Sequence, residues 1–106
     1  MGNVTYNKLV RDKIPEIIGE TGRVAVVETL DNKEYGKFLD HKLGEELQEY
    51  TSSGSIEELA DLVEVVYAIL KYKGIDIDEF EGIRMKKVIK RGAFDKRLLL
   101  KEVIEK

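Results

Sequence analysis

Two pairs of acidic residues carry the chemistry that this sequence offers, Glu46 with Glu49 and Glu58 with Asp61. Each pair is spaced by three residues, which brings both side chains to one side of a helix. Glu45 and Glu49, four residues apart, are like charges that weaken a helix rather than support it. Oxygen ligands that converge from two helices suit Mg²⁺, and also Mn²⁺. The pattern therefore predicts a divalent metal site held by Glu46, Glu49, Glu58 and Asp61.

The first pair belongs to a long amphipathic helix that we expect over residues 32 to 52, with Asp31 or Asn32 as its cap. At about 100° per residue, Glu46 projects into the apolar arc of this helix, and Glu49 lies at the edge between core and solvent. The apolar arc is formed by Tyr35, Leu39, Leu43, Leu47 and Tyr50.

The second pair belongs to a helix that we expect over residues 55 to 73. Its apolar residues cover nearly the whole circumference, which predicts a buried helix. Glu58 and Asp61 would then lose water at a cost of several kcal/mol per unpaired ion, unless a cation meets them. Ser55 and Glu58 also have the spacing of a capping box, which would occupy the Glu58 carboxylate with the Ser55 backbone instead.

The rest of the sequence predicts two further helices and two short segments. Pro15 opens a short helix that stops near Gly22, and a third long helix runs from Asp76 or Asp78 to Gly92. Residues 24–30 form a short strand or extended segment, and residues 98–104 a strand or a last helical turn. Short polar turns between helices predict antiparallel packing, so we expect one all-α domain over residues 1–106, an antiparallel helical bundle.

The amino-acid composition limits the range of possible functions. The charged share is 37% but the net charge is only −3, so no basic field favours a nucleic acid polymer. The chain has no cysteine and a single histidine, so any metal must be held mainly by oxygen, and a zinc site is disfavoured. No segment has the roughly 20 apolar residues of a membrane span, and we expect a soluble cytoplasmic protein. The small size favours a homo-oligomer, either a dimer or a tetramer.

The motifs Glu46-Leu-Gln-Glu49 and Glu58-Leu-Ala-Asp61 resemble the paired acidic motif of the MazG-like all-α nucleoside triphosphate pyrophosphohydrolases. Two further stretches, residues 6–15 and 87–94, resemble a short-chain branch of that superfamily related to phosphoribosyl-ATP pyrophosphohydrolase. These stretches are distributed from residue 6 to residue 94, which is most of the chain's length.

The resemblance implies hydrolysis between the α and β phosphates of a nucleoside triphosphate, which gives a monophosphate and pyrophosphate. Mg²⁺ on the four acidic ligands would bridge phosphate oxygens and lower the pKa of an attacking water. We expect Glu45 and Glu46 to be catalytic, with Glu45 either the general base or an outer-shell group. Basic side chains in the two resembling stretches are the expected phosphate contacts: Lys8, Arg11, Lys87 and Arg91.

Three functions stay open at this point. The first is removal of noncanonical nucleoside triphosphates, and the second is hydrolysis of phosphoribosyl-ATP in histidine synthesis. The third is a helical interaction module whose acidic residues bind a cation or a basic partner without turnover. This third function predicts that neutralising Glu46 or Asp61 leaves function intact and raises stability.

Overall fold

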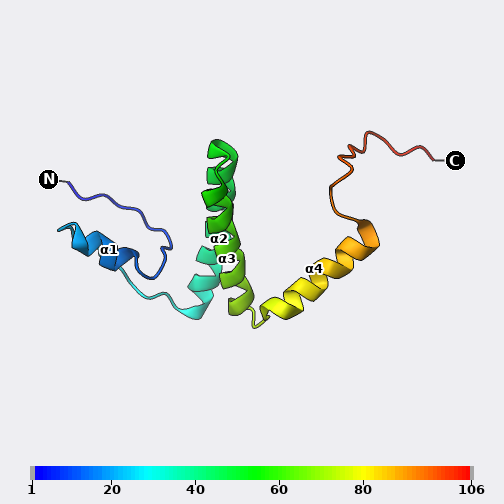
Figure 1. Cartoon of the computed structure of the whole chain (residues 1–106). Coiled ribbons are helices and arrows are strands. Elements are labelled where there is room, and N and C mark those ends of the chain that lie inside the picture. The colour runs from blue at the N-terminus through cyan, green and yellow to red at the C-terminus, as the bar shows by residue number, and fades with distance from the viewer. Residues whose placement is uncertain (1, 106) are drawn as a thin grey trace. The chain divides into compact units, whose positions relative to one another are not determined.

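The computed structural model describes residues 2–105, and all regular secondary structure among them is helical (Figure 1). The four helices are α1 (Ile14–Glu20), α2 (Asn32–Ser53), α3 (Ile56–Tyr72) and α4 (Ile77–Arg91). The prediction of an all-α helical protein is confirmed. The chain divides into two compact units, one up to Gly74 and one from Ile75 onward, and each is described by itself. A single domain over residues 1–106 stays a prediction.

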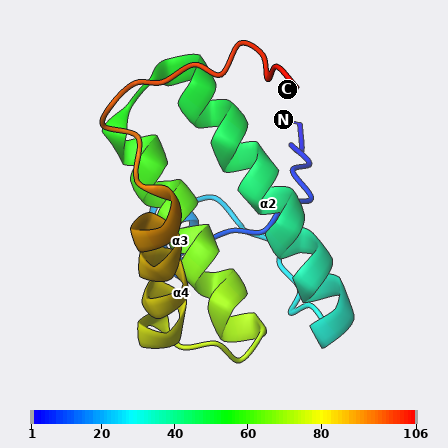
Figure 2. The same cartoon turned by 90° about the vertical axis from the view of Figure 1, so that its right-hand side faces the viewer.

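Helices α2 and α3 form a hairpin that dominates the first unit (Figure 2). Asp31 caps α2, because its carboxylate accepts a hydrogen bond of 2.8 Å from the Glu34 amide. The helix ends at Gly54, whose φ of 68° lies in the left-handed region that favours glycine. Only Gly54 and Ser55 separate the two helices, so α3 returns antiparallel to α2, as predicted.

The start of α3 differs from the predicted capping box. The Ser55 hydroxyl oxygen accepts a hydrogen bond of 3.1 Å from the Glu57 amide. The Ser55 amide itself donates to the hydroxyl oxygen of Ser53, also at 3.1 Å. In a capping box the Glu58 carboxylate would accept that amide proton. The capping role for Glu58 is therefore wrong, because the preceding helix already supplies the acceptor.

At the opposite end of the hairpin, the end of α3 packs closely against the start of α2. The Tyr72 hydroxyl donates a hydrogen bond of 3.0 Å to the Asn32 carbonyl oxygen, and its ring packs edge-on against Tyr35 with centroids 5.7 Å apart. A Cβ atom at position 36 would lie 2.6 Å from Cζ of Tyr72. Gly36 thus allows Tyr72 to cross the first turns of α2.

The core of the hairpin is small. Its buried apolar side chains are Leu39 on α2 and Val65 and Leu70 on α3. The prediction that α3 is buried around its circumference is wrong. Within residues 2–74, α3 packs against α2 alone, and one neighbouring helix covers only one side of it. The other side leaves an apolar stripe exposed, which we call the α3 outer stripe: Ile56, Val63 and Tyr67.

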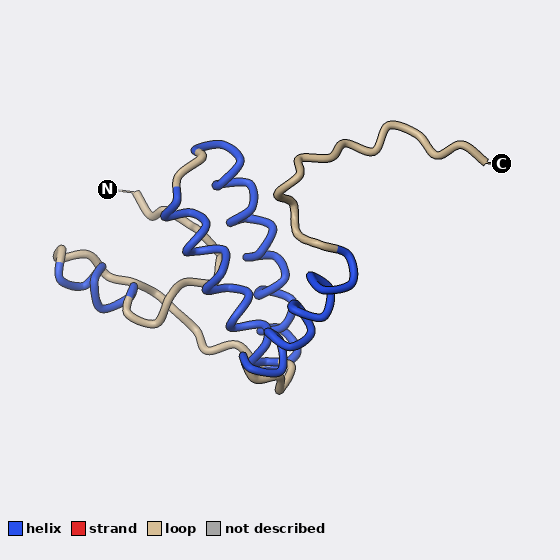
Figure 3. The backbone as a smooth tube through the Cα atoms, turned by 45° about the vertical axis from the view of Figure 1, so that its right-hand side comes forward, coloured by secondary structure: helices blue, strands red, loops and turns tan. Residues whose placement is uncertain are grey.

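The other segments are simpler. Helix α1 contains Pro15 in its first turn, and Gly22 follows it with a φ of 82°. Residues 24–30 and 98–104 adopt neither strand nor helix, so the strand and helical-turn alternatives for them are wrong, whereas an extended segment at 24–30 remains compatible (Figure 3). In the second unit, Asp76 caps α4 through a 2.8 Å bond from the Glu79 amide. None of the helices described has both the length and the apolarity to cross a membrane.

Candidate metal centre

The structure brings three of the four predicted metal ligands together, and we call this group the carboxylate cluster: Glu46, Glu58 and Asp61. Each offers one carboxylate oxygen, and these oxygens all lie within 4.8 Å of one another. Glu46 comes from α2, whereas Glu58 and Asp61 come from the first two turns of α3. Glu58 and Asp61 are three residues apart, so they lie on the same side of α3. Because the two helices are antiparallel and adjacent, that side can face the inward residue Glu46 on α2.

Burial separates Glu46 from an ordinary surface acid. Its residue exposure is only 5%, as the apolar arc of α2 predicted. Glu58 and Asp61 are partly buried. Charged residues are almost never fully buried unless a partner meets them. The position of Glu46 therefore requires a compensating positive charge or a proton.

Several carboxylate oxygens at this site have no donor within the described part of the chain. Buried Oε2 atoms of Glu45, Glu46 and Glu58 have no hydrogen-bond partner there, although Nζ of Lys42 lies 3.5 Å from the Oε2 atom of Glu45 as an ion pair. An unsatisfied buried acceptor loses the free energy of its bonds to water, and the loss is larger for a charged group. Hard oxygen donors that lack protein partners are the donor set that Mg²⁺ and Mn²⁺ prefer. The residues present therefore fit the predicted ion.

Electrostatics points the same way. Burial raises the pKa of Glu46 above its ordinary value of 4.5, and the negative charge of Glu49 raises it further, while Lys42 opposes both. Burial also raises the pKa of Glu58, again with Glu49 as the next cause. Both carboxyls hold their protons more tightly because burial disfavours the charged form, and because neighbouring negative charges add to that effect. A cation at this position would relieve that crowding.

Glu49 occupies a different place from the other three predicted ligands. Its side chain is exposed and it is not a member of the carboxylate cluster. It lines an open hollow of about 400 Å³ next to the cluster, together with Glu45, Gln48, Ser52 and Glu58. Glu49 thus acts on the cluster through its charge, and its role as a direct ligand stays a prediction.

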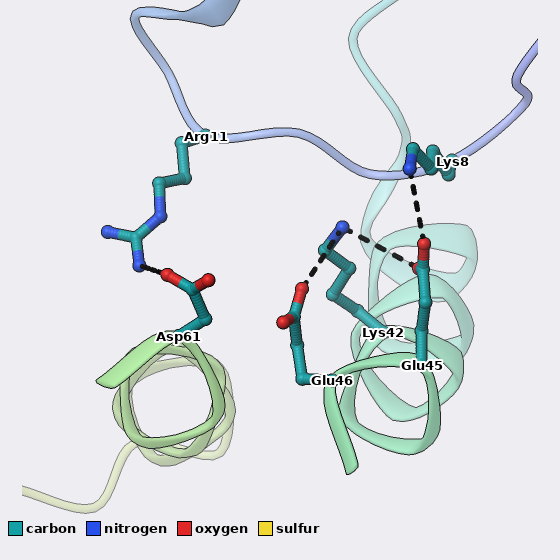
Figure 4. A network of polar contacts seen from close by, with 6 residues as sticks. All are labelled: Lys8, Arg11, Lys42, Glu45, Glu46 and Asp61. Carbon is teal, nitrogen blue, oxygen red and sulfur yellow. Dashed lines mark hydrogen bonds and ion pairs between the residues drawn. The ribbon is translucent and has the colours of Figure 1, made fainter. Parts of the chain in front are cut away.

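Two cations from the segment before α1 reach this site (Figure 4). The Arg11 guanidinium donates a hydrogen bond of 2.7 Å to Oδ1 of Asp61, and Nζ of Lys8 lies 3.4 Å from Oε1 of Glu45. Both residues were predicted from sequence to contact phosphate. The structure brings Arg11 to Asp61, a predicted metal ligand, and Lys8 to Glu45, a predicted catalytic residue.

Lys42 is a third cation at the site, and the sequence analysis missed it. Its Nζ lies 3.5 Å from Oε2 of Glu45 and 3.5 Å from Oε1 of Glu46, and only 17% of its side chain is exposed. Lysine is rarely this buried without a partner. The spacings of three and four residues from Glu45 and Glu46 were the signal that could have found it.

Glu45 therefore has an ammonium group near each carboxylate oxygen, with Lys8 at one and Lys42 at the other. A general base needs a free oxygen to accept a proton. Glu45 can take that role only after one of these lysines moves, so its catalytic role stays a prediction.

The last two predicted site residues lie on α4. Lys87 and Arg91 are exposed residues of the second unit, and Arg91 is its last helical residue. Their predicted role as phosphate contacts stays a prediction.

Comparison with known proteins gives one partial likeness. The chain is similar to an uncharacterized protein of Mycolicibacterium smegmatis, with 52% identity over 42 residues. The matched stretch covers 40% of this chain and 43% of that relative, so it spans less than half of either protein. No family model matches the chain, and no solved structure matches it significantly.

Proposed function

We propose that this protein is a Mg²⁺-dependent nucleotide pyrophosphohydrolase, which cleaves a nucleoside triphosphate between its α and β phosphates. The observation that carries the proposal is the carboxylate cluster itself. Three carboxylate oxygens from two helices lie within 4.8 Å, and Glu46 is buried with one oxygen unpartnered among the described residues. A purely solvated acidic face, the usual reason for charged residues on a helix, would leave these side chains in water.

The roles of the residues follow from their positions. Glu46, Glu58 and Asp61 would hold the ion, and Glu49, which lines the adjacent hollow, would be its fourth carboxylate ligand. When bound, Mg²⁺ supplies the positive charge that screens the phosphates and makes a water molecule more acidic. Mn²⁺ has similar ligand preferences and is the alternative ion.

The basic residues would bind and orient the substrate. Arg11 presents a planar fork that matches phosphate oxygens, and Lys8 adds a second positive charge on the same segment. Lys87 and Arg91 are further proposed phosphate contacts. Glu45, next to Glu46 on α2, would accept the proton of the attacking water once one of its lysine partners has moved.

A homo-oligomer is part of the proposal. The α3 outer stripe exposes 76% of Ile56, 41% of Val63 and 39% of Tyr67. These residues follow one another by seven and four positions, so they share one face of α3. Contiguous exposed apolar residues on a helix are typical of an interface. We propose that the same stripe of a second copy covers them.

One observation favours a non-catalytic alternative. Lys8, Arg11 and Lys42 already pair with carboxylates of the site, so its charges are partly compensated without any ion. A helical module that binds a structural cation or a basic partner would have the same features. Turnover is the measurement that separates it from the enzyme.

The test is pyrophosphate release from canonical triphosphates, noncanonical triphosphates and phosphoribosyl-ATP, with Mg²⁺, Mn²⁺ or EDTA. We expect release that EDTA abolishes, and a fall of at least about 100-fold for Asp61→Asn. Glu64→Gln is the matched control, because Glu64 is an exposed acid one turn further along α3. Absence of release from every substrate, or equal rates for Asp61→Asn and Glu64→Gln, would overturn the enzyme and favour the cation-binding module.

A further inference from the structure

The segment before α1, residues 2–13, contains no helix or strand, and almost all of it is exposed. Its two ion pairs nevertheless end on the candidate metal centre, 37 and 50 positions further along the chain. Figure 4 shows that the side chains of Lys8 and Arg11 extend from this one irregular segment toward α2 and α3, respectively. An irregular segment thus places one cation on a proposed metal ligand, Asp61, and another on the proposed general base, Glu45.

These contacts can exchange. The Arg11 side chain is 56% exposed and the Asp61 side chain 41% exposed. An ion pair with this much solvent contributes little to stability, because water screens the charges and the long side chain loses freedom. A divalent ion has twice the charge and contacts the oxygen directly, so it competes well for Asp61. Arg11 would then have to find another acceptor.

The charges of the described side chains at the site do not balance. Five acidic side chains gather at the site with three cations, which leaves two uncompensated negative charges: Glu45, Glu46, Glu49, Glu58 and Asp61 against Lys8, Arg11 and Lys42. One divalent ion carries a charge equal to that remainder. A polyphosphate then adds negative charge beside the ion, and exposed cations on an irregular segment are the groups free to meet it.

We propose that residues 8–11 form an exchangeable counter-ion for the metal centre. Without metal the segment rests on Asp61 and Glu45, and when metal and nucleotide bind it transfers Arg11 to the phosphate oxygens. This inference rests on the proposed function. It has a specific consequence: Arg11 opposes the binding of metal alone and favours the binding of nucleotide in the presence of metal. A residue that only stabilises the fold would not have effects of opposite sign.

The experiment measures both affinities of the full chain by titration calorimetry. For Mg²⁺ or Mn²⁺ alone, we expect Arg11→Gln to bind about 2- to 5-fold more tightly than the parent chain. For a nonhydrolysable triphosphate analogue with saturating Mg²⁺, we expect it to bind about 10-fold more weakly. Arg23→Gln is the control, since it removes the same charge from the same unit and Arg23 instead bonds to Thr21. Arg23→Gln should change neither affinity by a comparable factor.

The possible results distinguish failure of the counter-ion proposal from failure of the proposed function. Metal binding that is equal in Arg11→Gln and Arg23→Gln, or weaker in Arg11→Gln, overturns the counter-ion. Pyrophosphate release by the parent chain would still keep the proposed function in that case. Absence of metal binding in every variant overturns both. Lys8→Gln provides a second test if Arg11→Gln does not fold, because it removes the pair with Glu45 and should also tighten binding of metal alone.

Discussion

The hydroxyl oxygen of Ser53 accepts a hydrogen bond of 3.1 Å from the backbone N–H of Ser55, immediately before α3 begins. This bond satisfies the amide that the Glu58 carboxylate would otherwise cap. Glu58 instead joins the carboxylate cluster, with a buried Oε2 atom that has no hydrogen-bond partner in the described chain. The last residue of α2 thereby supplies the acceptor that a capping box would take from Glu58.

We expect Ser53→Ala to weaken metal binding by about 3- to 10-fold. Its Ser55 amide would be free, and Glu58 would be drawn back into a capping box, which is a competing arrangement of similar strength. Titration with Mn²⁺ measures the change. Thr51→Ala is the control, because Thr51 bonds to the Gln48 carbonyl within the same turn and leaves Ser55 untouched. Equal affinities for the two variants would show that Ser53 does not control Glu58.

We expect Glu46→Gln to stabilise the metal-free protein at pH 7 by roughly 0.5–1 kcal/mol, because it removes a buried charge from a group of like charges. The same variant should lose the stabilisation that Mg²⁺ gives the parent chain. Urea unfolding with and without Mg²⁺ measures both effects, and Glu64→Gln is the exposed control. A metal-free Glu46→Gln that is less stable than the parent would mean that the pair with Lys42 outweighs the repulsion.

Glu46 and Glu58 should contribute stability to the metal-free protein that is lost as the pH rises from about 4.5 toward neutrality. Glu46 and Glu58 have pKa values raised above 4.5 in the folded state, by burial and then by Glu49. In that window the folded state binds more protons than the unfolded state, so the free energy of unfolding falls with increasing pH.

The same raised pKa values make metal binding stronger with increasing pH, because the ion needs deprotonated carboxylates. Urea unfolding at several pH values, with and without Mg²⁺, measures the two opposite slopes. Glu46→Gln should flatten the metal-free slope. A slope identical to that of the parent chain would contradict the assignment to Glu46.

Two glycines of α2 should respond oppositely to the same substitution. Gly36→Ala would put a Cβ atom 2.6 Å from Cζ of Tyr72 and force the ring away from Asn32 and Tyr35. We expect a loss of about 1–2 kcal/mol, since overpacking outweighs the gain in helix propensity. Gly44→Ala meets no atom within 4 Å and should add about 0.5–1 kcal/mol. Thermal unfolding of both variants checks the contrast, and stabilisation by Gly36→Ala would show that Tyr72 is not held in place.

Val63→Asp should dissociate the proposed homo-oligomer, because it buries a charge in the α3 outer stripe. Light scattering after size exclusion measures the mass of the assembly. Val26→Asp is the control, since Val26 is 94% exposed and lies outside the stripe. An unchanged mass for Val63→Asp, or a monomeric parent chain, would remove the stripe as the interface.

The helical elements were accessible from local patterns. Asp31 and Asp76 cap α2 and α4, and Gly54 and Gly92 end them, within a residue or two of the predicted positions. These signals are local because a cap satisfies amides within its own first turn. The inward position of Glu46 was equally accessible, since helical periodicity alone sets the face of a residue. The extent to which α3 is buried could not be predicted in this way, because it depends on which other surfaces pack against that helix.

The sequence by itself determined which carboxylates could gather, because periodicity put Glu46 on the core side of α2 and put Glu58 and Asp61 together on α3. Only the tertiary structure decided their partners. In that structure Arg11 pairs with Asp61, and Ser53 replaces Glu58 as the acceptor for the Ser55 amide. Glu49 lines the hollow beside the carboxylate cluster. The physical reason is range: helical geometry repeats within a few residues, whereas a charge takes its partner from whichever segment the fold brings near.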